Sequence, residues 1–275
     1  MAETVQTRSV EPLLRERAAG AGPAQVAGEH GSLIGYLPVG FPDLSGSVDA
    51  VVAMAEHGVD VIELGVPYSD PVMDGPVIQR ATTAAIDGGF RVADVFRAIE
   101  AIRSRVDVPV LVMSYWNLVL QHGVDAYARD LAQAGGSGLI TPDLIPDEGE
   151  AWIAAAEAHG LDRVFLAAPT SSDERLERIS AVSRGFVYVV STMGVTGARS
   201  EVDARAGRLT ARLRAVTDRP LAVGLGISRP DQVRDVLGYA DGAIVGSAFV
   251  RALADGGADA VAELAARLAT GKTQG

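Results

Sequence analysis

The sequence LIGYLPVG, residues 33–40, is a short apolar run that ends in a turn. Seven further runs rich in Val, Ile and Leu follow it, and helical patterns lie between them. Continuous apolar character is expected of parallel strands that are covered on both faces. We therefore predict eight strands, at residues 33–38, 59–64, 108–113, 137–141, 163–167, 186–190, 220–223 and 242–245.

The alternation of strands and helices favours a (β/α)8 TIM barrel over a doubly wound open sheet. An open sheet would place a G-x-G-x-x-G turn after the first strand, and residues 35–40, GYLPVG, do not supply one. Helical patterns cover residues 48–57, 124–134 and 173–183, the last with Ser172 as its N-cap. The second connection is the longest and holds a loop, residues 66–76, and two helical patterns, residues 77–87 and 92–105. This second βα unit is therefore predicted to carry an extra helix.

One barrel domain is expected over residues 32–270, because a chain of 275 residues lies within the range of a single α/β barrel. Residues 1–31 are interpreted as a helix, at residues 10–19, and a connector of small residues. Residues 271–275 form a tail, in which the only lysine, Lys272, is expected to be frayed. A buried Schiff-base lysine, and with it a class I aldolase mechanism, is therefore excluded.

Composition excludes further classes of function. The formal net charge of −11 opposes binding to nucleic acid and to anionic membranes. The absence of cysteine removes thiolate nucleophiles and disulfides, and none of the four histidines stands at a metal-ligand spacing, so no metal site is predicted. No secretory leader and no run of 18 apolar residues can be drawn. The expected location is the cytoplasm.

Carboxylates at the carboxyl ends of the strands are the candidates for proton transfer, because active sites of barrels lie there. Glu63 ends the second run, where partial burial in the barrel mouth would raise its pKa. An ion pair with an arginine across the barrel is the alternative role for Glu63. Asp70 and Asp74 follow in the long loop, and they fit either an active-site role or simple turn formation.

Glycines after the seventh and eighth runs predict a phosphate site. The seventh run continues into GLGIS, residues 224–228, and the eighth into Gly246 and Ser247 before a helical pattern. Backbone amides at these positions of a barrel can hold a phosphate dianion. Residues 191–198, after the sixth run, suit a mobile lid. A phosphorylated substrate is therefore expected, and isomerisation and carbon–carbon cleavage both remain open.

Several motifs together resemble the α subunits of tryptophan synthase. They are IELGVPYSDP at residues 62–71, DGP at 74–76, TPDL at 141–144, FLAAPT at 165–170, GVTG at 194–197 and GLGIS at 224–228. The resemblance implies a carbon–carbon lyase that splits indole-3-glycerol phosphate into indole and glyceraldehyde 3-phosphate by retro-aldol cleavage. It also implies an allosteric αββα complex for tryptophan biosynthesis, with no cofactor on this chain and pyridoxal phosphate on the β subunit.

The resemblance also implies residue roles by position. Glu63 matches the acid/base glutamate, Asp74 the aspartate that holds the indole N–H, and Tyr188 a tyrosine close to the glutamate. The residues implied to bind substrate are Tyr36, Ile78, Met113 and Ile140 around the indole ring, Gly197, Gly226, Gly246 and Ser247 at the phosphate, and Thr196 in the lid. Residues implied to meet the β subunit are Pro67, Asp70 and Pro71.

Three alternatives remain at this stage. A stand-alone indole-3-glycerol phosphate lyase would use the same residues and release free indole without a partner. A sugar-phosphate isomerase or epimerase would share the phosphate site of the barrel. A non-catalytic subunit that only activates a β partner would leave Glu63 and Asp74 without a role.

Overall fold

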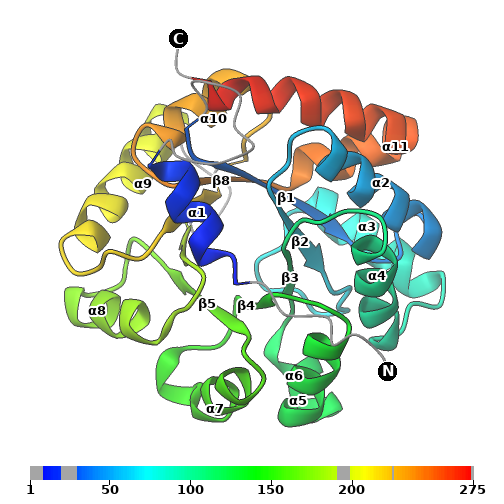
Figure 1. Ribbon diagram of the computed structural model, residues 1–275, viewed down its shortest axis with the longest axis horizontal. Helices are drawn as coiled ribbons and strands as arrows, with labels where there is room; N and C mark the ends of the chain where they lie inside the picture. The colour runs from blue at the N-terminus through cyan, green and yellow to red at the C-terminus, as the bar shows by residue number, and fades with distance from the viewer. Residues whose placement is uncertain (1–8, 20–29, 191–198, 225, 274–275) are drawn as a thin grey trace.

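The computed structural model describes residues 9–19, 30–190, 199–224 and 226–273. Eight parallel strands close into a barrel in their order along the chain (Figure 1). They are β1 (Ser32–Pro38), β2 (Val61–Gly65), β3 (Val110–Met113), β4 (Gly138–Thr141), β5 (Asp162–Ala167), β6 (Val187–Val190), β7 (Leu221–Gly224) and β8 (Gly242–Val245). Pairing of β8 with β1 closes the barrel. The predicted (β/α)8 barrel is confirmed.

Helices surround the barrel and connect successive strands (Figure 1). They are α2 (Leu44–Glu56), α3 (Pro76–Asp87), α4 (Ala93–Arg103), α5 (Trp116–His122), α6 (Val124–Gln133), α7 (Glu150–Ala158), α8 (Asp173–Val182), α9 (Arg199–Arg214), α10 (Pro230–Leu237) and α11 (Ser247–Ala269), with short 3-10 turns at Pro146–Glu148 and Thr270–Lys272. The extra helix predicted between β2 and β3 is present. Ser172 caps α8 by accepting a hydrogen bond from the backbone N–H of Arg175. Within the described residues, no helix is both long and apolar enough to span a bilayer.

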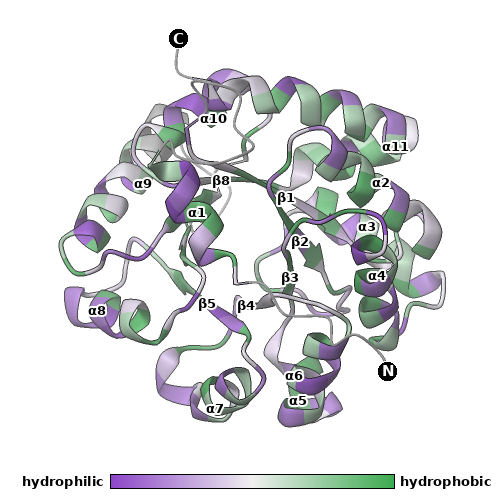
Figure 2. Ribbon diagram, viewed as in Figure 1, coloured by the Kyte–Doolittle hydropathy of each residue, from purple (hydrophilic) through white to green (hydrophobic). Residues whose placement is uncertain are grey.

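The strands separate two apolar cores. The larger core lies between the strands and the surrounding helices, whose hydrophobic faces turn toward the barrel (Figure 2). The smaller core fills the barrel itself, with one inward side chain or more from each of the eight strands, including Ile34, Val61, Leu111 and Tyr188. Burial on both faces explains why the strands have continuous apolar sequences. Side chains fill the interior of the barrel, so an active site can lie only at its mouth, at the carboxyl ends of the strands.

Helix α1 (Glu11–Ala18) closes the end of the barrel from which the strands start, and Figure 1 shows it lying across the barrel. Val10 and Leu14 are fully buried and belong to the interior core. The Asp162 carboxylate, at the first residue of β5, accepts hydrogen bonds from the backbone N–H of Val10 and from Ser9 Oγ. These contacts fix α1 on the end opposite to the mouth.

The prediction that Lys272 lies in a frayed tail is wrong. Its side chain is only 3% exposed, and Nζ lies 3.2 Å from a carboxylate oxygen of Asp60 and donates to the Gly58 carbonyl at 3.0 Å. Arg17 pairs with the same Asp60 carboxylate. Because Asp60 precedes β2, this buried cluster lies at the start of the strands, away from Glu63. The buried lysine therefore joins the C-terminal residues to the base of the barrel. Schiff-base chemistry stays excluded for a different reason, because the Lys272 amine is ion-paired with Asp60 at the end of the barrel away from Glu63.

We expect Lys272→Met to lower the free energy of unfolding by about 2 kcal/mol in urea titrations. Breaking a buried ion pair usually costs about 3–5 kcal/mol, and Arg17 would still balance part of the Asp60 charge. Arg267→Met, on the exposed side of α11, changes the net charge equally and is the matched control. Equal stability of the two variants would show that the Lys272 ion pair contributes nothing.

Candidate active site

Glu63 is the central residue of β2 and points into the mouth of the barrel. Its side chain is 1% exposed, and its Oε2 atom has no hydrogen-bond partner among the described residues. Burial, and then the nearby Asp74 carboxylate, raise the pKa of Glu63 to about 8. The carboxyl is therefore protonated at neutral pH and can act as a proton donor.

The alternative role of Glu63, an ion pair with an arginine, has no support in the described part of the chain. No guanidinium is within ion-pair distance of its carboxyl there, and the charge that most affects it is that of Asp74. Two carboxyls that share a buried site cannot both ionise easily. Glu63 is therefore the proton donor of the pair, and Asp74 is the carboxylate.

Asp74 lies in the loop between β2 and α3 and is held by a tyrosine. Tyr115 Oη donates to Asp74 Oδ1 at 3.2 Å and accepts the backbone N–H of Met73 at 3.0 Å. Burial raises the pKa of Asp74, and the hydrogen bond from Tyr115 acts in the opposite direction. This bond favours the ionised form of Asp74, which is the form that can stabilise a developing positive charge.

Tyr115 was not among the residues predicted from the sequence. It follows β3 by two residues and is 4% exposed, with its ring 5.2 Å from that of Tyr68. Burial raises the pKa of Tyr115 to about 12, so its hydroxyl keeps its proton and remains a donor. The available signal was its place beyond the carboxyl end of a strand, where barrel sites lie.

Two further tyrosines, Tyr36 on β1 and Tyr188 on β6, face Glu63 from other strands. Burial raises the pKa of Tyr36 well above its usual value, and Asp74 and Glu63 raise it further. Burial and then Glu63 likewise raise the pKa of Tyr188. Both phenols therefore stay neutral beside the Glu63 carboxyl. The structure thus brings Tyr36, Glu63, Asp74 and Tyr188 together.

Three glycines make room for these tyrosines. A side chain at Gly65 would overlap the Tyr36 hydroxyl, and a Cβ atom at Gly224 would lie 2.9 Å from Tyr188 Oη. A Cβ atom at Gly246 would lie 3.4 Å from Tyr36 Cδ1. The small residues that end β2 and β7 and follow β8 therefore determine where the two phenols can lie.

The apolar residues assigned to the indole ring come from three elements. Ile140 of β4 is fully buried in the barrel core, and Met113 of β3 is partly buried against it. Ile78 lies in the first turn of α3 and packs against the outer core. Met113 and Ile140 are direct neighbours in the β3–β4 register, so they offer one continuous apolar surface.

The residues assigned to phosphate are described in part. Gly226 has a φ of +66°, a conformation that suits glycine, and the space beside its Cα is open. Gly246 precedes α11 as its N-cap, and Ser247 is the first residue of that helix. Unpaired backbone N–H groups at a helix start attract anions. Thr196 and Gly197 lie outside the described residues.

The loop assigned to the partner is exposed beyond its first residue. Pro67 is buried, Asp70 is exposed and Pro71 is half-buried. The next residue, Val72, has 80% of its side chain exposed, and Leu120 of α5 is 51% exposed. Within the described residues these are the two exposed large hydrophobic side chains. Both side chains are therefore accessible for contact with another chain.

No group of three or more His, Cys, Asp or Glu side chains within the described ranges could hold a metal ion. Three of the histidines have ordinary structural partners: His57 bonds the Ala53 carbonyl, His122 the Asp130 carboxylate and His159 the Asp125 carboxylate. The acid–base chemistry of the mouth therefore falls to its carboxyls and phenols.

Comparison with known proteins identifies relatives along almost the whole chain. The family model for the tryptophan synthase alpha chain matches residues 24–274. The tryptophan synthase alpha chain of Leifsonia xyli is 64% identical over 245 residues, which are 89% of this chain and 94% of that protein. The alpha chain of Mycobacterium avium is 57% identical over 246 residues, 90% of each chain.

Solved structures agree with the sequence relatives. A tryptophan synthase structure from Mycobacterium tuberculosis superposes with a TM-score of 0.89 at 51% identity, covering 98% of this chain and 100% of that one. A chain of a tryptophan synthase complex from Pyrococcus furiosus gives a TM-score of 0.80 at 32% identity, covering 88% and 97% of the two chains. The likeness therefore includes both the fold and the sequence over most of the chain.

Proposed function

The chain belongs to the tryptophan synthase alpha chain family, and from that membership we infer that it cleaves indole-3-glycerol phosphate into indole and glyceraldehyde 3-phosphate. The reaction is a carbon–carbon lyase step of tryptophan biosynthesis. The observation that supports it best is the protonated Glu63, buried without a partner beside Asp74. A retro-aldol cleavage of this substrate needs such a donor.

Indole is a poor leaving group as a carbanion, so C3 of the ring must first gain a proton. Glu63 would donate it and form an indolenine whose C=N⁺ accepts the electron pair of the breaking C–C bond. Asp74 would accept the ring N–H and stabilise the positive charge on that nitrogen. Glu63, now ionised, would take the proton of the hydroxyl on the glycerol carbon bonded to the ring, as that oxygen becomes the aldehyde. Tyr188 would remain close to Glu63 during both transfers.

The hydrogen bond from Tyr115 should affect the pH dependence of the reaction. We expect Tyr115→Phe to lower kcat about 10-fold and to move the acid limb of the kcat profile to higher pH, because the bond that lowers the Asp74 pKa is lost. Tyr68→Phe is the control, since the Tyr68 hydroxyl accepts a hydrogen bond from Asn117 and donates none to Asp74. An unchanged acid limb would contradict the role of Tyr115 as a positioning residue.

The substrate phosphate would lie at Gly197, Gly226, Gly246 and Ser247, while Thr196 of the lid would contact the catalytic aspartate. We expect Ser247→Asp to raise KM at least about 10-fold, because a carboxylate would face the phosphate dianion. Ser247→Ala keeps the backbone amides and should change KM less than about 10-fold. A KM of the aspartate variant equal to that of the alanine variant would contradict a phosphate at this position.

A β subunit is the proposed partner, in an αββα complex that receives the indole. The exposed Val72 beside Asp70 and Pro71 supports a contact at this loop. The pyridoxal phosphate of the complex is assigned to the β subunit, and no step of the cleavage proposed for this chain uses it. The proposed location of the complex is the cytoplasm.

The decisive experiment measures indole release from indole-3-glycerol phosphate with and without a tryptophan synthase β subunit. Weak activity that rises strongly with the partner is expected of a coupled α subunit. Equal activity without the partner would instead assign a stand-alone lyase. Failure to form indole under both conditions would overturn the proposed reaction, and turnover of aliphatic sugar phosphates would then indicate an isomerase or epimerase.

A further inference from the structure

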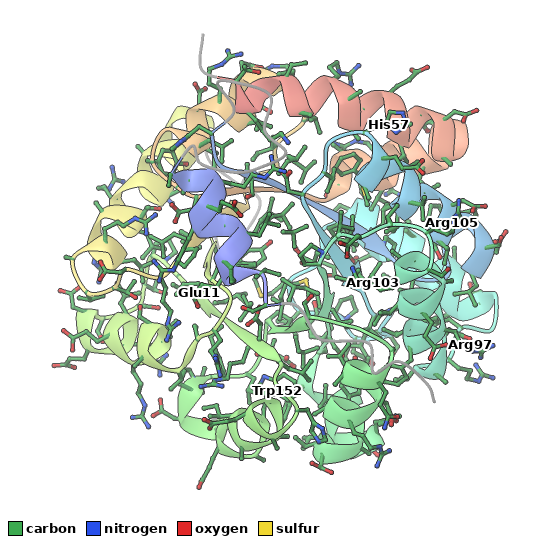
Figure 3. All side chains as sticks on the ribbon, viewed as in Figure 1. Glu11, His57, Arg97, Arg103, Arg105 and Trp152 are labelled. Carbon is green, nitrogen blue, oxygen red and sulfur yellow. The ribbon has the colours of Figure 1, made fainter. Side chains whose placement is uncertain are left out.

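A cationic hollow lies at the opposite end of the barrel from Glu63. It has a volume of about 700 Å³ and is lined by Ser9, Glu11, Pro12, Arg15, Arg163, Arg184 and Arg219. Glu11 belongs to α1, which Figure 3 shows over the end of the barrel. We name this feature the basal arginine hollow. Four guanidinium groups in one place are unusual in a chain of net charge −11.

The arginines converge on the hollow from separate parts of the fold. Arg163 is the second residue of β5, Arg184 precedes β6 and Arg219 precedes β7, while Arg15 comes from α1. Consecutive parallel strands of a barrel start side by side, so the closed sheet itself assembles the cluster. The cluster is therefore a product of the tertiary structure and not a charged run on one solvated helix face.

Acidic partners balance only part of this charge. Glu11 accepts from Arg15 at 2.8 Å and from Arg219 at 3.1 Å. Asp162 is occupied by Ser9 and the Val10 backbone. Arg184 has no hydrogen bond or ion pair from its side chain to any described residue. Two cations are thus shared by one carboxylate, while Arg163 and Arg184 have no ion pair within the described residues and interact only at longer range with the Asp162 charge.

Arg163 is the strongest indication of a ligand. Its Nε donates to the Val182 carbonyl at 2.6 Å, but its Nη1 is buried and has no hydrogen-bond partner among the described residues. A buried donor without a partner destabilises a protein unless something binds it. Burial, followed by the charges of Arg184 and Arg219, lowers the pKa of Arg163, whereas Glu157 and Asp162 act in the opposite direction. An anion in the hollow would relieve the repulsion between Arg163 and the neighbouring Arg184 and Arg219.

From these contacts we propose that the basal arginine hollow binds a small phosphorylated anion, as a site separate from the active site. Guanidinium groups bind phosphate oxygens in bidentate pairs, and several of them can surround a di- or polyphosphate. The volume lies within the range of small-molecule sites. The site does not depend on the proposed reaction, because it occupies the base of the barrel.

Calorimetric titration of the full chain with inorganic pyrophosphate at low ionic strength tests the site. Arg184→Gln should weaken the basal binding event about 10-fold, and Arg184→Glu should abolish it. Arg251→Gln, an exposed arginine on α11, removes one charge elsewhere and should leave binding unchanged. Arg184→Glu should still form indole at the rate of the unaltered chain, because Arg184 is far from the mouth.

Pyrophosphate can also occupy the phosphate position in the mouth, and Ser247→Asp separates the two events. Ser247→Asp should still bind pyrophosphate in the basal arginine hollow, which Arg184→Glu should not. Equal pyrophosphate affinity and stoichiometry in Arg184→Glu and Arg251→Gln would overturn the proposal. A defect of Ser247→Asp alone concerns the active site, so failure of the proposed function and failure of the basal site give different results.

Discussion

Glu63→Gln is expected to lower kcat for indole formation by about 10³-fold while indole-3-glycerol phosphate still binds. Glutamine has nearly the shape of glutamic acid but can neither donate the proton to C3 of the ring nor take the hydroxyl proton. Single-turnover assays with equilibrium binding separate the two quantities. A variant that binds substrate and forms indole at the normal rate would remove Glu63 from the mechanism.

The pH dependence gives an independent test of Glu63. Because the pKa of this carboxyl is raised from 4.5 to about 8, kcat of the unaltered chain should fall as the pH rises through about 8, where the donor loses its proton. The same shift affects stability: the favourable contribution is complete below pH 4.5 and is lost as the pH rises toward 8, since the unfolded chain ionises first. Glu63→Gln should therefore be no less stable than the unaltered chain at pH 8, so that its inactivity cannot be assigned to unfolding.

Asp74→Asn is expected to lower kcat by about 10²- to 10³-fold, the second largest effect. The amide oxygen can still accept the indole N–H, but it carries no full negative charge to stabilise the cationic ring. The loss should appear mainly in kcat, because the charge develops after substrate has bound. Asp87→Asn, at the exposed end of α3, is the matched control and should be without effect.

The result for Asp74→Asn should also differ from that for Glu63→Gln in its pH profile. The asparagine variant keeps the proton donor but loses the Asp74 charge that helps to raise the Glu63 pKa, so its remaining activity should still fall with rising pH, at a pH below about 8. Loss of that alkaline limb would mean that the limb reports Asp74 and would contradict the division of roles between the two carboxyls. An unchanged kcat would indicate that Asp74 acts only as a turn residue.

Much of the barrel could be predicted from the sequence, because strands covered on both faces have continuous apolar runs. The predicted strand at residues 242–245 agrees with β8 in both bounds, whereas the predicted strand at residues 59–64 begins two residues before β2. Asp60 explains this difference. Its carboxylate accepts hydrogen bonds from Lys272 and from the Leu33 backbone N–H, just before β2 begins. Such contacts join distant segments and leave no local pattern.

The candidate site was predictable to the extent that it lies on strand ends. Glu63 could be recognised because a carboxylate in an apolar run is rare, and its raised pKa is confirmed. Tyr115 was missed because its role depends on a loop 41 residues earlier, which no periodicity connects to it. The roles of Thr196 and Gly197 stay predictions, since both residues lie outside the described ranges.

Because Lys272 is buried at the base of the barrel, its chemical reactivity can report when this part of the protein opens. The chain has a single lysine side chain, and in the folded protein its amine is paired with Asp60 and closed to solvent. An amine-directed acylating reagent can reach that nitrogen only when the C-terminal residues separate from the barrel. The rate of acylation at this one position would therefore measure local opening of the C-terminus without any introduced label, and its comparison with global unfolding would show whether the two ends of the chain separate together.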